Sequence, residues 1–159
     1  MAMRRRRQAG LTLVELIVAF TILALLTTMA VPMAKYKVRR DKERELRHAL
    51  LEMRTAVDKY KDLCDNKQLD NTVAGKIGSE CYPETLEALV QGVKKTGAVD
   101  QKFKFLRRVP RDPFTNSREW GKRSVQDETS STSWGGQNIF DVYTKSTEKA
   151  PDGTPYAEW

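Results

Sequence analysis

The sequence has one histidine and two cysteines among its 159 residues. A single histidine cannot form a multi-histidine metal site, and the chain has no Gly-rich phosphate loop and no Cys-x-x-Cys pair. These absences argue against an enzyme. The formal net charge is +7, but residues 4–7 are all arginine and supply four of those charges. The small excess that is left does not predict nucleic-acid binding.

Apolar residues are concentrated in one stretch and are sparse elsewhere. Residues 11–34 include 18 apolar residues in 24. As a helix this stretch would be about 36 Å long, and the hydrocarbon core of a membrane is about 30 Å thick. The segment is therefore long enough to span a membrane.

Three kinds of amino-terminal segment fit a basic leader followed by an apolar run. The first is an uncleaved signal anchor, and the second is a secretory signal peptide with a small-x-small site at Thr28-Met29-Ala30. The third is a prepilin-type segment that is cut on the cytoplasmic side of the membrane. Glu15 lies inside the apolar run, and the run is longer than an ordinary signal-peptide core, which argues against the second kind.

The residues at the start of the apolar run distinguish these possibilities. Residues 10–15 read GLTLVE, and this pattern resembles the signal of the type IV pilin and type II secretion pseudopilin superfamily. The resemblance implies that prepilin peptidase cuts after Gly10 and removes leader residues 1–10. It also implies N-methylation of the new terminal residue, Leu11.

Glu15 and Pro32 are the two irregular residues of the apolar run. A carboxylate in hydrocarbon costs at least about 2.5 kcal/mol, so Glu15 needs a partner unless it snorkels or is protonated. The resemblance implies that the partner is the Leu11 amine of a neighbouring subunit. Pro32 cannot donate a hydrogen bond to the Thr28 carbonyl, so we expect a kink there. This is either a membrane-exit kink or, as the resemblance implies, a helix that melts locally in a filament core.

The chain after the apolar run keeps a helical pattern. Residues 35–45 are strongly charged, and apolar residues then recur at helical spacing, at Leu46, Ala49, Leu50, Met53, Val57 and Tyr60. Residues 35–63 are therefore predicted to continue the helix of residues 11–34 as an amphipathic half.

Residues 64–159 are predicted to form a globular head. Residues 65–80 are rich in loop formers, residues 82–90 predict a short helix, and residues 118–125 and 138–144 predict strands. The expected fold class is α+β, with a long amino-terminal helix packed on a small antiparallel sheet, the lollipop form of pilins.

The head extends the resemblance to the major pseudopilins of type II secretion. They share a Tyr-Pro pair, a Leu-x-Ala-Leu helix and a Pro-x-Asp-Pro-aromatic turn, which here are Tyr82-Pro83, residues 86–89 and residues 110–114. The resemblance implies a subunit of a helical pseudopilus that drives protein export across the outer membrane. The implied partners are sister copies, minor pseudopilins, prepilin peptidase and an inner-membrane assembly platform, with the head in the periplasm.

Two other functions remain open at this point. A type IV pilin for adhesion, motility or DNA uptake shares every feature of residues 1–63. A membrane-anchored periplasmic binding module is the second alternative, and in such a protein Glu15 would be incidental.

Two further expectations depend on the resemblance. A head outside the cytoplasm predicts a disulfide between Cys64 and Cys81, and two free, packed thiols are the alternative. Residues 144–159 resemble a terminal loop that binds calcium, with Asp152, Glu148 and the backbone oxygen of Lys145 as the implied ligands. Asp152-Gly153 is equally a plain turn signal.

Overall fold

The structure is a computed structural model, and it describes residues 12–70, 79–98 and 101–159. Its elements in chain order are α1 (Leu13–Asp65), α3 (Leu86–Gln91), β1 (Val93–Lys94), β2 (Lys102–Phe103), β3 (Gly121–Arg123), β4 (Asp141–Tyr143) and the 3-10 helix η1 (Tyr156–Glu158). The chain divides into two compact units between Asp41 and Lys42. The first unit contains the first half of α1, and the second contains the rest of α1 and the head. Each is described by itself.

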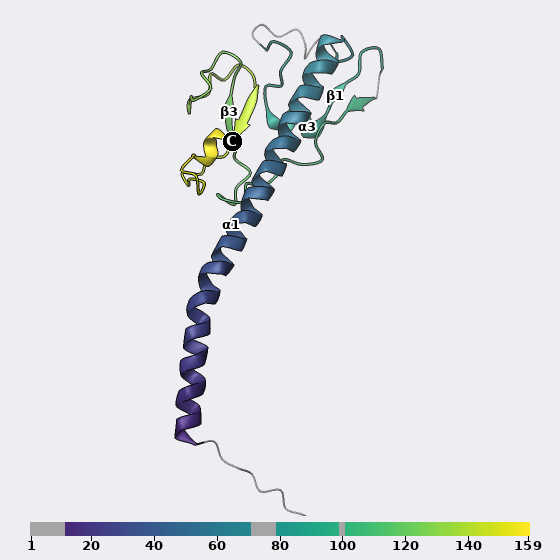
Figure 1. Cartoon of the computed structure of the whole chain (residues 1–159). Helices are drawn as coiled ribbons and strands as arrows, with labels where there is room; N and C mark the ends of the chain where they lie inside the picture. The colour runs from purple at the N-terminus through teal and green to yellow at the C-terminus, as the bar shows by residue number, and fades with distance from the viewer. Residues whose placement is uncertain (1–11, 71–78, 99–100) are drawn as a thin grey trace, which may run out of the picture. The chain divides into compact units, whose positions relative to one another are not determined.

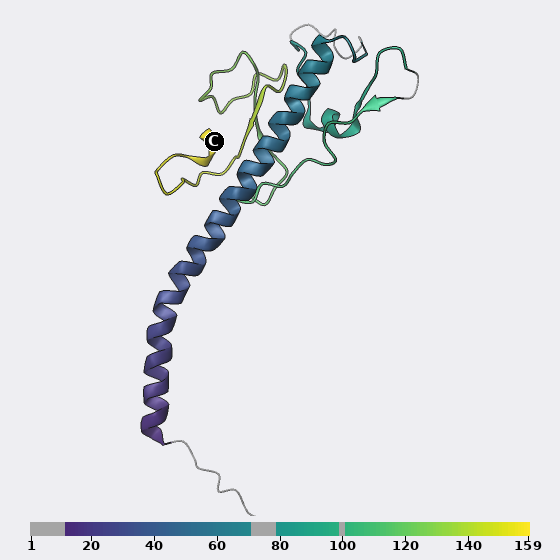
Figure 2. The ribbon, with the colours of Figure 1, turned by 45° about the vertical axis from the view of Figure 1, so that its right-hand side comes forward.

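In the second unit, α1 is the central element of the core. The predicted apolar face is buried, with Leu46 and Met53 fully inaccessible to solvent and Tyr60 2% exposed. Figures 1 and 2 show β3 on one side of this part of α1 and α3 on the other. The helix therefore supplies the surface against which both parts of the head pack.

The described residues of the head form two small antiparallel sheets where one was predicted. β1 pairs with β2, and β3 pairs with β4 so that Lys122 lies opposite Val142. The pair β3 and β4 is shorter than the predicted strands because side chains take over from the backbone ladder beyond Arg123. The amide of Val125 donates to the Asn138 side chain, and the Ser124 hydroxyl donates to the Asn138 carbonyl.

The short helix begins later than predicted. We expected residues 82–90 to be helical with Pro83 in the first turn, but α3 starts at Leu86. Thr85 is extended and its side chain accepts from the amide of Ala88, which makes it the N-cap. Pro83 lies in the connection before α3, where its carbonyl accepts from the amide of Ile139. The helix therefore starts where Thr85 can cap it, because threonine is a favoured N-cap residue. The preference for proline in the first turn of a helix does not set the boundary here.

These elements confirm the α+β fold class, with a long amino-terminal helix followed by small antiparallel sheets. The core between them is completed by side chains that come from far along the chain. Leu89 of α3, Val142 of β4 and Tyr156 of η1 are all fully buried in one cluster with the apolar face of α1.

Candidate functional site

Glu15 caps the start of its own helix. Its Oε2 accepts from the amide of Thr12 at 2.9 Å and from the Thr12 hydroxyl at 3.1 Å, and the Glu15 amide donates back to that hydroxyl. This reciprocal arrangement is a capping box, which satisfies helix amides that have no partner in the helix. The Thr-x-x-Glu spacing in the sequence is the signal that could have predicted this cap, in addition to the cost of a charge in the apolar run.

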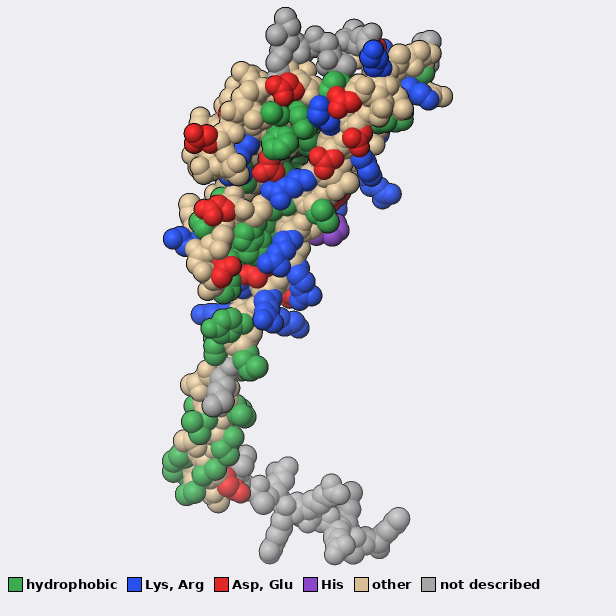
Figure 3. Space-filling model, turned by 45° about the horizontal axis from the view of Figure 1, so that its top comes forward, with side chains coloured by type: hydrophobic (Ala, Val, Ile, Leu, Met, Phe, Trp, Pro, Cys, Tyr) green, Lys and Arg blue, Asp and Glu red, His purple; other side chains and the backbone are tan. Residues whose placement is uncertain are grey.

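The first half of α1 exposes its apolar side chains. By length and composition this helix can cross a membrane, and none of its most apolar 18-residue window is buried within the structure. Leu13, Phe20 and Leu25 are each at least 65% exposed. Figure 3 shows hydrophobic side chains along the visible face of this half of the helix. Such a surface requires lipid or other protein to cover it.

The helix runs through Pro32 without a break in its assigned bounds. The hydroxyls of Thr27 and Thr28 donate to the carbonyls of Leu23 and Leu25, rather than to the Thr28 carbonyl that Pro32 leaves without an amide partner. Local melting of this turn inside a filament stays a prediction. Gly10 and Leu11, the predicted processing residues, lie outside the described residues.

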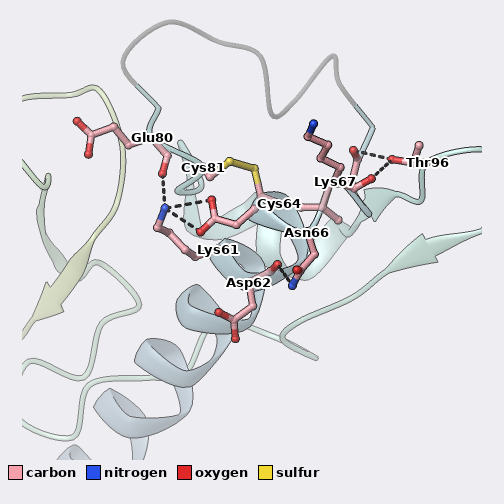
Figure 4. The surroundings of a disulfide bond; sticks show 10 residues. Lys61, Asp62, Cys64, Asn66, Lys67, Glu80, Cys81 and Thr96 are labelled. Atoms are coloured by element: carbon pink, nitrogen blue, oxygen red, sulfur yellow. Dashed lines mark hydrogen bonds and ion pairs between the residues drawn. A yellow bond between two sulfur atoms is a disulfide. The ribbon is translucent and has the colours of Figure 1, made fainter.

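Cys64 and Cys81 form a disulfide, as the sequence predicts for a head outside the cytoplasm. Figure 4 shows the bond joining the last turn of α1 to the segment that leads into α3. Glu80 and Cys81 both have positive φ, at 47° and 64°, a region that residues other than glycine seldom adopt. The disulfide holds the chain in this tight reversal beside the end of the helix.

Lys61 stabilises the same reversal from the side of α1. Its ammonium group donates to the carbonyl of Glu80 at 3.0 Å and pairs with Asp65, and it lies 5.0 Å from the centre of the Tyr82 ring. A dashed line in Figure 4 marks the contact between Lys61 and Glu80. The disulfide and Lys61 therefore fasten the reversal at two adjacent points.

Asp112 organises the Pro-x-Asp-Pro-aromatic turn from a fully buried position. Its Oδ1 accepts from the amide of Phe114 at 2.8 Å, and its Oδ2 accepts from the hydroxyl of Thr144. The turn places the Phe114 ring against Tyr156, with 4.2 Å between ring centres. Asp112 and Phe114, two of the residues in the motif of residues 110–114, thus have a structural function, which is to join this turn to the residue after β4 and to η1.

The predicted calcium ligands Asp152, Glu148 and Lys145 all lie in the segment between β4 and η1. Asp152 closes a turn by accepting from the amide of Thr154 at 2.9 Å, and this bond holds the pKa of Asp152 below its usual range. Lys145 pairs with Glu119, and the Glu148 carbonyl accepts from the Tyr156 amide. No group of three His, Cys, Asp or Glu side chains that could hold a metal ion occurs in the described residues. Asp152 and Glu148 supply two carboxylates, which are few against the six to eight oxygen ligands that this hard cation takes. Calcium binding stays a prediction.

Two arginines that the sequence did not indicate as functional residues contact the segment between β4 and the carboxyl end of the chain. Arg54 of α1 and Arg123 of β3 both contact the carboxylate of Asp141 in β4, at 2.7 Å and 3.4 Å. We call these three residues the arginine clamp. Arg54 and Arg123 are 87 and 18 positions away from Asp141 in the chain, so no local spacing in the sequence could have indicated the clamp.

Similarities to known proteins include the amino-terminal segment and most of the chain. The family model described as the prokaryotic N-terminal methylation motif matches residues 5–31. The type II secretion system core protein G of Pseudomonas aeruginosa is 30% identical over 119 residues, which cover 72% of this chain and 73% of that protein. The protein of the same name from Aeromonas hydrophila is 29% identical, with the same shares of each chain covered. No solved structure matches significantly.

Proposed function

Since this chain belongs to the family of type II secretion system core protein G, we propose that it is a structural subunit of a pseudopilus. A pseudopilus is a helical filament that drives protein export across the outer membrane. The observation that carries this function is the alignment with core protein G over 72% of the chain. Residues 1–63, which a type IV pilin would share, are less than half of the chain, so the alignment includes much of the head. The similarity therefore favours secretion over adhesion, motility or DNA uptake.

The proposed life of the subunit begins in the bacterial inner membrane. Prepilin peptidase removes residues 1–10 after Gly10, and Leu11 becomes the N-methylated amino terminus. The match of residues 5–31 to the N-terminal methylation motif supports this step. Residues 11–34 then anchor the subunit, and the head lies in the periplasm, an oxidising compartment in which the disulfide between Cys64 and Cys81 is stable.

Assembly places the exposed apolar half of α1 among its counterparts in other copies. Inside such a bundle the Glu15 carboxylate pairs with the Leu11 amine of the next subunit, because a buried charge requires a partner. The capping bonds from Thr12 position that carboxylate at the first turn of the helix. Minor pseudopilins and an inner-membrane assembly platform are the further proposed partners. The subunit itself acts by packing and not by catalysis.

The decisive experiment replaces Glu15 in the full chain, expressed together with its secretion system. Glu15→Leu should insert into the membrane normally, because it makes the apolar run more hydrophobic, and should fail to form filaments. Val14→Leu is the matched control, since it changes an adjacent exposed side chain without removing a charge. Membrane fractionation and recovery of sheared filaments give the two readouts. Filament assembly by Glu15→Leu at the level of the unchanged protein would contradict the proposal.

Processing is tested separately by intact mass and by sequencing of the amino terminus of protein taken from native membranes. The proposal requires an N-methylated Leu11 at the start. A Met1 start would instead indicate a signal anchor, and a Val31 start would indicate a secreted soluble protein.

A further inference from the structure

The carboxyl-terminal segment, residues 145–159, is held in place by positive charge that belongs to the chain itself. We propose that the guanidinium groups of Arg54 and Arg123 serve as the built-in cations of this segment, in place of a bound calcium ion. This inference concerns how the head is held together and does not depend on the proposed function in secretion.

The oxygen atoms around the clamp are of the kind that a hard cation takes from a loop. Nη2 of Arg54 donates to the carbonyl of Trp159 at 2.7 Å and to that of Val142 at 3.4 Å. Arg123 donates through Nη2 to the carbonyl of Ala157 at 3.3 Å and through Nε to that of Ser131 at 3.1 Å. Together with the Asp141 carboxylate, these are oxygen atoms of the chemical kinds that calcium takes from proteins, and here guanidinium N–H groups bind them.

Guanidinium groups fill this position because each presents several N–H donors in a fixed plane. The Nε of Arg54 bonds Asp141, and its Nη2 bonds the backbone oxygen of Trp159, the residue after η1. A single side chain of α1 therefore bonds both β4 and the carboxyl-terminal segment. Charge-assisted hydrogen bonds of this kind are about twice as strong as neutral ones. A lysine would offer a point charge without the planar set of N–H donors, here called the fork, that lets one guanidinium bind several oxygens.

The burial of the clamp makes these bonds matter more than an ordinary surface ion pair. The Arg123 side chain is 8% exposed, that of Asp141 is 22% exposed and that of Arg54 is 37% exposed. Solvent screens such groups only in part, and removal of one partner leaves the other charge uncompensated in a semi-buried site. The loss of Arg54 or Asp141 should therefore loosen the segment that they hold.

The rest of the segment is held by aromatic packing, which needs no ion. Tyr156 is fully buried, contacts the Trp159 ring at 4.8 Å between centres, and donates its hydroxyl proton to Glu43 of α1 at 2.7 Å. Arg47 lies 4.2 Å from the centre of the Trp159 ring. These contacts and the clamp account for the placement of η1 against α1 and β4.

The test uses the purified full chain in detergent, with the midpoint of thermal unfolding measured in excess CaCl2 and in excess EGTA. The unchanged protein should give the same midpoint in both. Arg54→Gln should lower the midpoint by about 5 °C in both media. It should also speed amide hydrogen exchange in residues 145–159 about tenfold or more relative to α3. Arg118→Gln, at an exposed arginine in the same half of the head, is the matched control and should change neither quantity.

Two results would overturn the inference. The first is a lower midpoint or faster exchange in residues 145–159 of the unchanged protein when EGTA replaces calcium. The second is a variant Arg54→Gln that cannot be distinguished from Arg118→Gln. If Arg54→Gln does not fold, Arg54→Lys takes its place, because it keeps the charge and loses the fork. Under the inference it exchanges faster than the unchanged protein in residues 145–159, and equal exchange would count against it.

Discussion

The hydroxyl of Thr144 donates a hydrogen bond to Oδ2 of Asp112, and both side chains are completely buried although they are 32 positions apart in the chain. This bond joins the turn after Pro110 to the residue that follows β4. The other carboxylate oxygen of Asp112 accepts from the amide of Phe114, so both oxygens are used. The donors stabilise the buried carboxylate, and the carboxylate is the hydrogen-bond acceptor that each of these donors needs.

Replacement of Asp112 by alanine should destabilise the head, because it leaves the buried Thr144 hydroxyl and the Phe114 amide without their acceptor. A group left unsatisfied in this way costs about 1–3 kcal/mol. Thr144→Val should cost less, since it removes the donor and leaves Asp112 its backbone donors. Denaturant unfolding of the full chain measures both, and an Asp112→Ala variant as stable as Thr144→Val would contradict this account.

The disulfide should contribute on the order of 3 kcal/mol through the entropy of the unfolded chain, given the 17-residue separation of Cys64 and Cys81. A variant with both cysteines changed to alanine is expected to lose that amount in denaturant unfolding. Dithiothreitol should destabilise the unchanged protein and have no effect on this variant. Equal stability of the unchanged protein with and without the reductant would show that the bond contributes nothing.

Met53 and Leu51 lie on opposite sides of the same part of α1 and provide a matched pair. Met53 is fully buried, whereas Leu51 is 66% exposed. Met53→Ala should cost about 2–5 kcal/mol because it leaves a cavity against the head. Leu51→Ala should change the free energy of unfolding by about 0.5 kcal/mol or less. A large loss of monomer stability from Leu51→Ala would indicate a different packing of the helix in the head.

Asp127 should make the head sensitive to acid. Its Oδ2 accepts from the amides of Ser124 and Gly135, and these bonds lower the pKa of Asp127 below its ordinary value of about 3.9. The unfolded chain therefore takes up the proton at a higher pH than the folded chain does. The stabilising contribution is complete above the unfolded pKa and is lost as the pH falls through the folded pKa.

Asp127→Asn keeps an acceptor oxygen and removes the titration, so its stability should fall less between pH 5 and pH 2 than that of the unchanged protein. Glu128→Gln is the neighbouring control. Circular dichroism melts across this pH range would decide the matter, and parallel curves for Asp127→Asn and the unchanged protein would refute the assignment.

Periodicity in the sequence was sufficient to predict α1 and its buried face. Leu46, Met53 and Tyr60 recur at helical spacing, and their burial depends only on which side of the helix they occupy. The antiparallel pairing of β3 with β4 was also foreseen from alternating residues near Val142. β1 and β2 were missed because strands of two residues are too short to show a period. The start of α3 was misplaced because two capping preferences compete at Pro83 and Thr85.

For the site, the sequence by itself determined two features. The first is an apolar helix of membrane-spanning length with Glu15 near its start, and the second is a pair of cysteines spaced to close one loop. Each of these depends on residues close together in the sequence. Only the tertiary structure decided that Arg54 and Arg123 meet at Asp141 and that Asp112 meets Thr144. The reason is physical: a hydrogen bond or ion pair between distant residues depends on where the core places their backbones, and no periodic pattern records that placement.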